Sequence, residues 1–155
     1  MHEKFAGLAE SLHPSFERLL AMEPLTTSTL PMDMPASGIY LLSEGETHLY
    51  VGRSNRMRSR LRRHGTPYSK HNVASFAFLI ARESTGNTAA SYKPEGSRAA
   101  LIEEPAFADA FVAAKARVRE MDARYVAETD QLRQALLEIY VHVVLDTPYN
   151  DFATH

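Results

Sequence analysis

The sequence predicts an α+β protein in which a small sheet is flanked by helices. Two short apolar segments, residues 37–43 and 47–52, are separated by a turn that contains Gly45, which is typical of a β-hairpin. A third strand is expected at residues 121–128, where a tyrosine and a valine stand between charged residues. Most of the remaining segments space their apolar residues as helices do. At 155 residues, the chain has the size of one domain that buries a substantial core.

An N-terminal helical extension and linker are expected over residues 1–36. Residues 3–23 carry apolar side chains at helical spacing, but Pro14 interrupts them, so one kinked helix and two short helices both remain open. Three prolines within residues 24–35 lie among threonines and serines, which is typical of a linker.

The segment after the hairpin is expected to form a basic helix. Ser54 or Asn55 is expected to cap its start, and Gly65 is expected to end it. Met57 and Leu61 are four residues apart and are expected to face the core. The basic side chains of this helix are expected on an outward stripe that consists of Arg56, Arg60, Arg63 and His64.

Two helices are expected between this basic helix and the third strand. Residues 72–82 fit the spacing of a strand as well as that of a helix, but their length and alanine content favour a helix. Residues 84–97 contain two glycines and a proline and are expected to form a loop. Residues 106–120 are expected to form a helix whose apolar side consists of Phe107, Phe111, Ala114 and Val118.

The last helix is expected to begin at a cap formed by Thr129 or Asp130 and to end before Pro148. Its apolar residues are spaced as one stripe facing the core, and this stripe consists of Leu132, Ala135, Leu136, Ile139 and Val143. Glu138 lies beside the stripe, at the expected boundary of the core. A carboxylate is uncommon in such a place unless it is paired or bound to a metal.

The composition excludes several kinds of site. The chain has no cysteine, so disulfides and thiolate metal sites are impossible. Its N-terminus carries Glu3, Lys4 and Glu10 and does not have the pattern of a secretory signal. No apolar run approaches the roughly 20 residues that are needed to cross a bilayer. We therefore expect a cytoplasmic protein that has no membrane partner.

The charge of the chain is distributed unevenly. No acidic residue lies between Glu46 and Glu83, whereas eight basic residues do, six of them arginines within residues 53–63. The other nine basic residues and all 19 acidic residues lie outside this stretch and give the remainder a charge of −10. Such a basic patch on an acidic chain favours a local site for a polyanion. A solvated, charged helix face is the alternative interpretation.

Arg60 and His64 are four residues apart and are expected to project from one face of the basic helix. An arginine offers a planar fork of donors to phosphate oxygens, and a histidine passes protons near neutral pH. Glu138 offers an oxygen ligand that suits Mg²⁺, with a salt bridge to an arginine as the alternative. Glu138 and His142 together suit a transition metal only weakly, because no third ligand stands at an obvious spacing.

Tyr40 and Tyr50 lie on the two strands of the expected hairpin, next to the basic helix. Tyrosines are ordinarily core or interface residues, and this interpretation is sufficient for either one alone. An ordinary tyrosine pKa of about 10 makes the side chain a poor base at neutral pH. Nearby arginines and a metal would favour the charged form and make it a better base.

These residues together resemble the ordered motifs of the GIY-YIG nuclease family. Residues 38–40 read Gly-Ile-Tyr and residues 50–52 read Tyr-Val-Gly, with valine where the family usually has isoleucine. The later matches are Arg60, His64, Glu138 and the Pro-Tyr-Asn sequence that ends at Asn150. The resemblance covers residues 37–151, with residues 84–120 as an inserted loop and helix relative to the minimal family core.

The resemblance implies a small antiparallel sheet flanked by helices, here of three strands, and metal-assisted hydrolysis of a phosphodiester, usually in DNA. It implies that Glu138 holds one Mg²⁺ or Mn²⁺ ion. Arg60 would neutralise charge that develops on the scissile phosphate. Tyr40 is our choice of general base for the attacking water, with Tyr50 positioning the water or sharing that role.

By the same resemblance, His64 relays protons or orients a tyrosine, and Asn150 braces the site. Further phosphate contacts that do not depend on base sequence are expected from Arg53, Arg56, Arg63 and Lys70. Double-stranded DNA is the expected partner, whereas nicking, repair-type incision, RNA cleavage and a homodimer all stay open. The alternatives from other classes are a nucleic-acid-binding module without turnover and a structural or protein-interaction domain.

Overall fold

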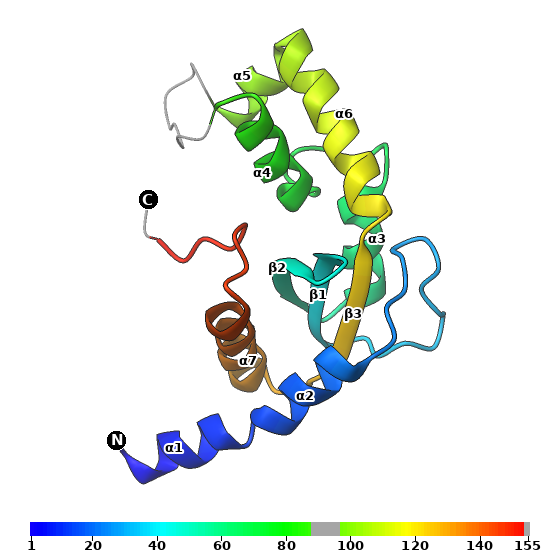
Figure 1. The fold of residues 1–155 in the computed structure, drawn as a ribbon. Coiled ribbons are helices and arrows are strands. Elements are labelled where there is room, and N and C mark those ends of the chain that lie inside the picture. Colours follow the sequence, from blue (N-terminus) through cyan, green and yellow to red (C-terminus); the bar gives the residue numbers. More distant parts are fainter. Residues whose placement is uncertain (88–96, 154–155) are drawn as a thin grey trace.

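A computed structural model describes residues 1–87 and 97–153 of the protein (Figure 1). The elements follow in the order α1 (Glu3–Glu10), α2 (His13–Ala21), β1 (Gly38–Glu44), β2 (Thr47–Ser54), α3 (Met57–Gly65), α4 (Ser75–Ser84), α5 (Arg98–Glu103), α6 (Pro105–Arg119), β3 (Asp122–Ala127) and α7 (Gln131–Leu145). The loop that we expected at residues 84–97 falls largely on residues 88–96, which lie outside the described residues.

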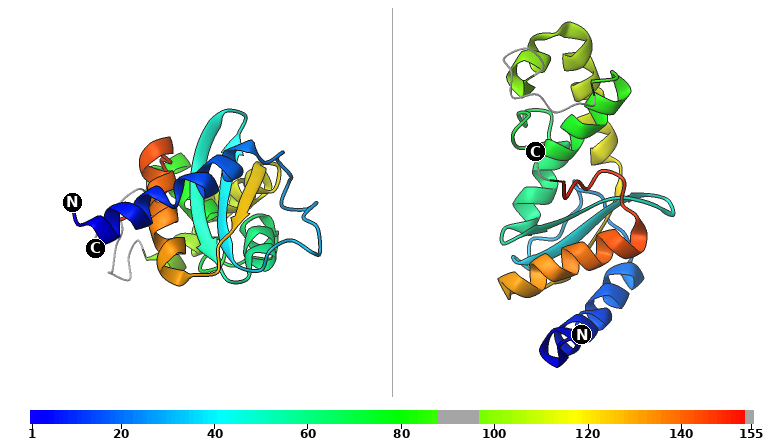
Figure 2. Two further views of the ribbon diagram at one scale, coloured as in Figure 1. Left: turned by 90° about the horizontal axis from the view of Figure 1, so that it is seen from below. Right: turned by 90° about the vertical axis from the view of Figure 1, so that its left-hand side faces the viewer.

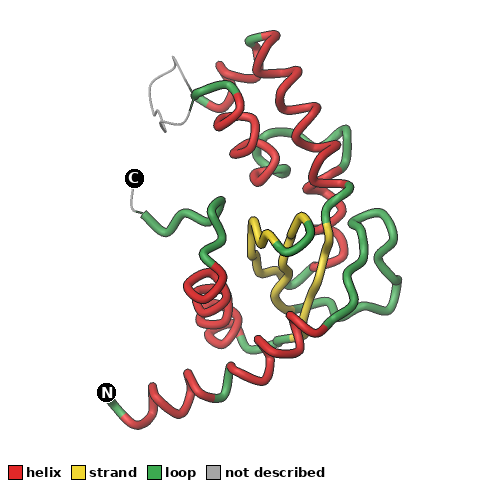
Figure 3. The backbone as a smooth tube through the Cα atoms, in the orientation of Figure 1, coloured by secondary structure: helices red, strands yellow, loops and turns green. Residues whose placement is uncertain are grey.

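The three strands form one antiparallel sheet in the order β2-β1-β3 (Figure 3). Tyr40 on the central strand lies opposite Gly52 of β2 and Tyr125 of β3. Gly45 makes the turn between β1 and β2 with a φ of 59°, in the left-handed region that glycine adopts without steric cost. The fold is therefore the predicted α+β arrangement of a small antiparallel sheet flanked by helices.

Helices cover both faces of the sheet (Figure 2). On one face, α2 and α7 pack against Ile39, Leu41 and Val51. On the other face, Tyr40 and Leu42 belong to a larger core together with α3, α4 and α6. Because successive residues of a strand point to opposite faces, the central strand β1 is buried on both sides.

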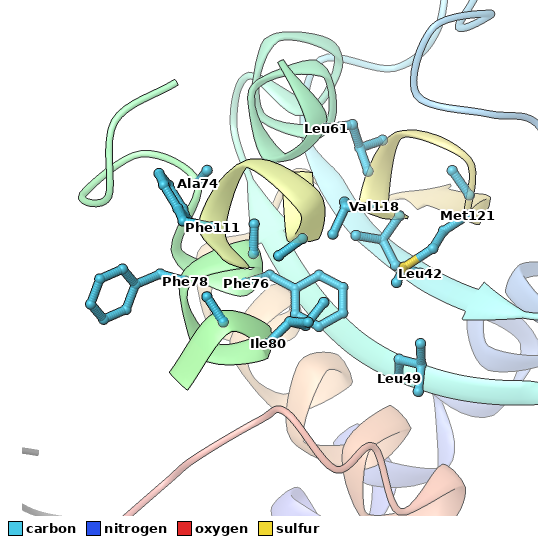
Figure 4. Close-up of a cluster of buried hydrophobic side chains, with 14 of the residues drawn as sticks. Leu42, Leu49, Leu61, Ala74, Phe76, Phe78, Ile80, Phe111, Val118 and Met121 are labelled. Atoms are coloured by element: carbon cyan, nitrogen blue, oxygen red, sulfur yellow. The ribbon is translucent and has the colours of Figure 1, made fainter. Parts of the chain in front are cut away.

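The larger core lies between the sheet and the helices α3, α4 and α6 (Figure 4). All four apolar residues predicted for the helix at 106–120 are buried there, on α6. Met57 and Leu61 of α3 are fully buried, as predicted. Residues 75–84 are helical, as the composition of 72–82 favoured, and this helix, α4, buries Phe76, Phe78 and Ile80.

The N-terminal segment forms two helices, α1 and α2, so the alternative of one kinked helix at Pro14 is excluded. α1 buries none of its residues, whereas α2 buries Phe16 and Leu19 in the core on the α7 side of the sheet. No helix among the described residues combines the length and the apolar character needed to cross a bilayer.

The prediction of which side of α7 faces the core is wrong. Three residues of the predicted stripe, Leu132, Ile139 and Val143, are 61%, 43% and 64% exposed. Asp130, one of the two predicted caps, does accept a hydrogen bond from a backbone N–H of the first turn. The side of the helix that is buried instead carries Gln134, Leu137 and Val141.

Gln134 explains this difference. Its side-chain amide donates to Oδ1 of Asn55 at 2.9 Å and to the backbone oxygen of Glu128 at 2.7 Å. Buried polar side chains ordinarily have their hydrogen bonds satisfied in this way. Apolar spacing alone places such a residue at the surface, and the whole stripe was predicted with the wrong orientation as a result.

The predicted cap of α3 is also wrong. Arg56 stands at the N-cap position, and no side chain caps the helix. Ser54 Oγ accepts a hydrogen bond from the backbone N–H of Arg56 at 2.9 Å, within the turn that precedes the helix. Asn55 instead exchanges two hydrogen bonds of 3.0 Å with the side chain of Gln131. Asn55 therefore connects the β2–α3 turn to α7.

Candidate functional site

Three rings from three elements meet on the face of the sheet that α3 covers. Oη of Tyr40, on β1, lies 2.8 Å from Nε2 of His64, on α3, in a hydrogen bond. The ring centroid of Tyr50, on β2, lies 6.3 Å from that of Tyr40 and 5.7 Å from that of His64. The ring of Tyr50 also stacks on Phe76 of α4 at a centroid distance of 4.8 Å. The three rings are therefore held by packing as well as by the hydrogen bond.

The prediction that His64 lies on the outward stripe of the basic helix is wrong. Its exposed fraction is 0%, and its ring faces the interior because the hydroxyl of Tyr40 provides a hydrogen-bonding partner there. Arg56 and Arg63 are exposed, as predicted, and Arg60 is half-buried.

Gly52 makes room for the phenol of Tyr40. A Cβ atom added at Gly52 would lie 2.4 Å from both Cζ and Oη of Tyr40, which is far closer than two such atoms approach in proteins. Any side chain at this position would therefore displace the phenol from His64. The fold therefore gives a steric reason for the glycine of the Tyr-Val-Gly sequence at residues 50–52.

Arg60 is held in place by groups that precede and begin α4. Its guanidinium donates to the backbone oxygen of Val73 at 2.8 Å and to Oγ of Ser75 at 3.0 Å. Its positive charge lowers the pKa of Tyr40 and of Tyr50, in opposition to burial. An arginine that is fixed in this way presents its charge to the rings without having to be ordered first.

Burial dominates the protonation of the three rings. It raises the pKa of Tyr40 far above its ordinary value and raises the pKa of Tyr50 in the same direction. Burial also lowers the pKa of His64 to about 3, and the charge of Arg60 adds to this decrease. At neutral pH, His64 is therefore a neutral ring and both phenols keep their protons. A role of Tyr40 as a base requires a further positive charge beside it.

Glu138 on α7 is half-buried and forms an ion pair with Arg53 of β2, with 3.1 Å between Nε and Oε2. Burial raises the pKa of Glu138, and the charge of Arg53 opposes this increase. The negative charge of Glu138 in turn raises the pKa of Tyr40 and of Tyr50. The carboxylate therefore belongs to the same electrostatic cluster as the rings.

Glu138 is the residue of this cluster that suits a metal ion. No group of three His, Cys, Asp or Glu side chains that could hold a metal occurs in the described part of the chain. A single carboxylate fits Mg²⁺ or Mn²⁺, because Mg²⁺ binds through one or two carboxylates and keeps several waters, and Mn²⁺ favours the same ligands. The Nδ1 atom of His142, the weak candidate for a second ligand, lies 2.8 Å from Oγ1 of Thr147 instead.

Asn150 supports the outer edge of β2. Its Oδ1 accepts from the backbone N–H of Val51 at 2.9 Å, and its Nδ2 donates to the backbone oxygen of Val51 at 2.7 Å. The backbone N–H of Tyr149 donates to the oxygen of Leu49 at 3.2 Å. These bonds satisfy groups that an edge strand otherwise leaves unpaired. They fix the strand on both sides of Tyr50.

The surface beside Arg60 is hollowed over about 390 Å³. This hollow, the α3–α4 hollow, is lined by Ser54, Asn55, Arg56, Ser59, Arg60, Arg63, Asn72 and Val73. Two of the predicted phosphate contacts, Arg56 and Arg63, therefore line the same hollow as Arg60. Lys70 is exposed but does not line this hollow, and Arg53 forms an ion pair with Glu138.

Three contacts of the site were not predicted from the sequence. Phe76 lies against Tyr50, and Val73 and Ser75 hold the guanidinium of Arg60. All three residues belong to the segment around the start of α4, for which the sequence indicated only a helix or a strand. No local pattern identifies a residue that supports the side chain of another element.

Comparison of the chain with protein-family models, with curated proteins and with solved structures finds no match. The functional interpretation therefore depends on the chemistry of the cluster itself. That cluster consists of Tyr40, Tyr50, Arg60, His64 and Glu138, which four different elements bring together.

Proposed function

We propose that this protein is a divalent-metal-dependent endonuclease that hydrolyses phosphodiester bonds in DNA. The observation that supports this most is the convergence of two tyrosines, a histidine, an arginine and a glutamate from β1, β2, α3 and α7. The same residues carry the resemblance to the GIY-YIG nucleases. Hydrolysis of a phosphodiester requires a positioned water, neutralised phosphate charge and a stabilised leaving group, and the cluster contains a candidate for each.

Arg60 is the group that neutralises the phosphate. Its bonds to Val73 and Ser75 hold the guanidinium at the wall of the α3–α4 hollow. Because these bonds exist before any ligand arrives, little ordering is required when charge develops on the phosphate oxygens. Arg56 and Arg63 line the same hollow and would contact neighbouring phosphates.

Tyr40 and His64 form the route for a proton. Tyr40 is buried and keeps its proton in the free protein, while His64 is neutral and bonded to the same phenol. Nδ1 of His64 is buried and has no partner among the described residues. A neutral imidazole carries its proton on one of its two nitrogens, and the hydrogen bond to Tyr40 is compatible with either tautomer. Tyr50 limits where a water can stand beside Tyr40.

Glu138 would hold one Mg²⁺ or Mn²⁺ ion. When bound, such an ion supplies positive charge to the phosphate and the leaving oxygen, and it lowers the pKa of nearby phenols. Arg53 pairs with Oε2 of Glu138, so Oε1 is the oxygen that would hold the ion while this pair remains. Asn150 acts on the site through the backbone of β2.

Cleavage of supercoiled plasmid in the presence of Mg²⁺ or Mn²⁺ tests the proposal. The wild-type protein should nick or linearise the plasmid, and Glu138→Gln should abolish cleavage while DNA affinity is retained. Arg60→Ala should lower the cleavage rate by at least two orders of magnitude, the scale of a lost charge-stabilising donor. Glu44→Gln is the matched control, because it removes a carboxylate that is also paired with an arginine, Arg117, outside the site.

Two outcomes would contradict the proposal in different ways. If DNA is bound but is not cut with any divalent ion, the protein is a nucleic-acid-binding module on this scaffold. If no nucleic acid binds, and Arg56→Glu together with Arg60→Glu changes no partner, it is a structural or interaction domain. Cleavage that survives in Glu138→Gln would contradict the assigned metal ligand alone.

A further inference from the structure

A second cationic pocket lies on the other side of α3 from the candidate site. This pocket, the Arg119 pocket, has a volume of about 160 Å³. It is lined by Thr27, Ser28, Arg58, Arg62, Gly65, Thr66 and Arg119. Three arginines and three hydroxyl-bearing residues thus surround it, and none of the lining residues is acidic. The residues come from the N-terminal linker, α3 and the end of α6.

Helix geometry separates this pocket from the candidate site. Arg58 and Arg62 are one turn apart on α3, and each is two residues from Arg60. Two residues correspond to a rotation of about 200° around a helix. Arg58 and Arg62 therefore point away from the face of α3 that carries Arg60 and His64.

The Nε atom of Arg58 lacks a partner. It is buried and has no hydrogen bond within the described residues. Arg58 is also in the first turn of α3, where the helix dipole disfavours a positive charge. A buried donor without a partner costs free energy that a bound acceptor would recover. The helix dipole accounts for arginines near helix ends such as Arg62 and Arg119, but it does not account for Arg58.

The other two arginines are unpaired as well. Within the described residues, neither Arg62 nor Arg119 forms an ion pair or a side-chain hydrogen bond, although both line the same small pocket. The buried Thr27 lines the same pocket. Like charges that share a pocket repel one another, and an anion between them removes that repulsion.

Gly65 determines how closely the two helices approach at the pocket. A Cβ atom added to Gly65 would lie 2.8 Å from Cα and 2.9 Å from N of Arg119. The end of α6 therefore rests directly on the end of α3. A larger residue at position 65 would therefore move Arg119 away from α3, whose Arg62 lines the same pocket.

We propose that the Arg119 pocket binds a phosphate group. Guanidinium groups present paired donors whose geometry matches phosphate oxygens, and Thr27 lines the pocket with a further hydroxyl on the linker side. The group belongs either to the backbone of a nucleic acid or to a small free phosphate. This binding does not depend on the proposed nuclease activity, since no residue of the pocket belongs to the catalytic cluster.

The surface favours the nucleic-acid backbone as the source. A third hollow shares Arg58, Arg62 and Thr66 with the Arg119 pocket, and it shares Arg56 and Arg63 with the α3–α4 hollow. The three hollows therefore form a continuous basic surface around α3. A strand bound beside Arg60 has a path along this surface, and one of its phosphates occupies the Arg119 pocket.

The test compares the double variant Arg62→Gln/Arg119→Gln with the control Lys4→Gln/Arg18→Gln, which removes the same charge from α1 and α2. All four side chains are exposed, so neither variant should unfold, which circular dichroism verifies. Inorganic phosphate is titrated by calorimetry against chloride of equal ionic strength. DNA affinity is measured in a Glu138→Gln background, so that binding is recorded whether or not the wild-type protein cuts DNA.

We expect the pocket variant to bind inorganic phosphate at least tenfold more weakly than wild type, and the control to bind it as wild type does. The phosphate belongs to a nucleic acid if the pocket variant also binds DNA more weakly than the control. In that case the slope of log affinity against log salt should fall by about 0.9, because one phosphate is no longer neutralised. If DNA affinity is the same in both variants, the ligand is a small phosphate. Equal phosphate and DNA affinities in wild type, pocket variant and control would overturn the proposal.

Discussion

Gly52 shows how the absence of a side chain positions a functional group. We expect Gly52→Ala to displace Tyr40 from His64, because the added Cβ would lie 2.4 Å from the phenol. Overpacking of this kind costs about 1–3 kcal/mol of the free energy of unfolding, and DNA cleavage should be lost with it. Chemical denaturation and the plasmid assay measure the two effects.

Gly7→Ala provides the control for this substitution. Gly7 lies in α1, and beyond its chain neighbours and the backbone of its own helix no atom lies within 4 Å of the position of an added Cβ. Alanine there should stabilise the helix by roughly 0.5–1 kcal/mol relative to glycine and leave cleavage unchanged. A Gly52→Ala protein that keeps both wild-type stability and wild-type cleavage would contradict the assigned place of Tyr40.

His64 should make the stability of the protein depend on pH. Burial lowers its pKa to about 3 in the folded chain, against an ordinary value of 6.5. Below about pH 6.5, His64 therefore binds a proton in the unfolded chain but not in the folded chain. The contribution of the neutral His64 to the free energy of unfolding is complete above that pH and is lost as the pH falls towards 3. The expected loss is about 1.4 kcal/mol for each pH unit.

Denaturant unfolding at pH 5 and pH 7 measures this dependence. The protein with His64→Gln should lose less stability between the two pH values than wild type, because its side chain does not titrate. Equal losses in the two proteins would show that His64 is protonated in the fold or is exposed to solvent.

At the residue scale, the sequence indicates which side chains form the candidate site better than it indicates how they are held. Tyr40, Arg60 and Glu138 are selected by residue type and spacing, and the structure brings them into one cluster. The inward direction of His64 was not evident, because it depends on the hydroxyl of Tyr40, 24 residues away. The supports of Arg60 at Val73 and Ser75 likewise depend on a helix whose position the chain alone does not reveal.

The orientation of α7 is the clearest discrepancy at the scale of elements, and it leads to a direct test. Leu137 is fully buried, whereas Ile139 is 43% exposed. Leu137→Ala should therefore cost about 2–5 kcal/mol of the free energy of unfolding, the range for a buried leucine. Ile139→Ala should cost less than about 1 kcal/mol, as partly exposed positions do. Denaturant unfolding of both variants compares the two faces, and a larger cost at Ile139 would support the stripe predicted from apolar spacing.

The sequence predicts elements well where apolar periodicity alone determines burial. α6 is an example, because its four predicted core residues are all buried. α7 is different, since its buried side includes Gln134, whose amide is satisfied by Asn55 and by the backbone of Glu128. The prediction of the cap of α3 is wrong for the same reason, because Asn55 forms hydrogen bonds with α7 and does not cap its own helix. Polar contacts between distant segments determine both cases.

On the scale of the whole molecule, the sheet lies between two hydrophobic cores, and residues from both of its faces contribute to the candidate site. Tyr40, Tyr50 and His64 belong to the side of the sheet covered by α3, whereas Glu138 comes from α7, which packs on the other face. The two contributions interact at β2, which carries both Tyr50 and the Arg53 partner of Glu138. The sequence predicted the α+β class from the hairpin and the helical segments, but only the paired strands show how α7 reaches the site.

The separation of charge over the whole molecule predicts where a nucleic acid would bind. Arg56 and Arg63 line the α3–α4 hollow, whereas the chain outside residues 47–82 carries −10 and repels a polyanion. We expect Arg56→Gln/Arg63→Gln to weaken DNA binding and to reduce the slope of log affinity against log salt by about 0.9 for each phosphate that is no longer neutralised. Fluorescence anisotropy over a salt series measures both quantities. Lys4→Gln/Arg18→Gln removes the same charge from α1 and α2 and should leave the slope unchanged. An equal reduction of the slope in both variants would mean that DNA affinity depends on the net charge of the protein, and that DNA does not bind specifically along α3.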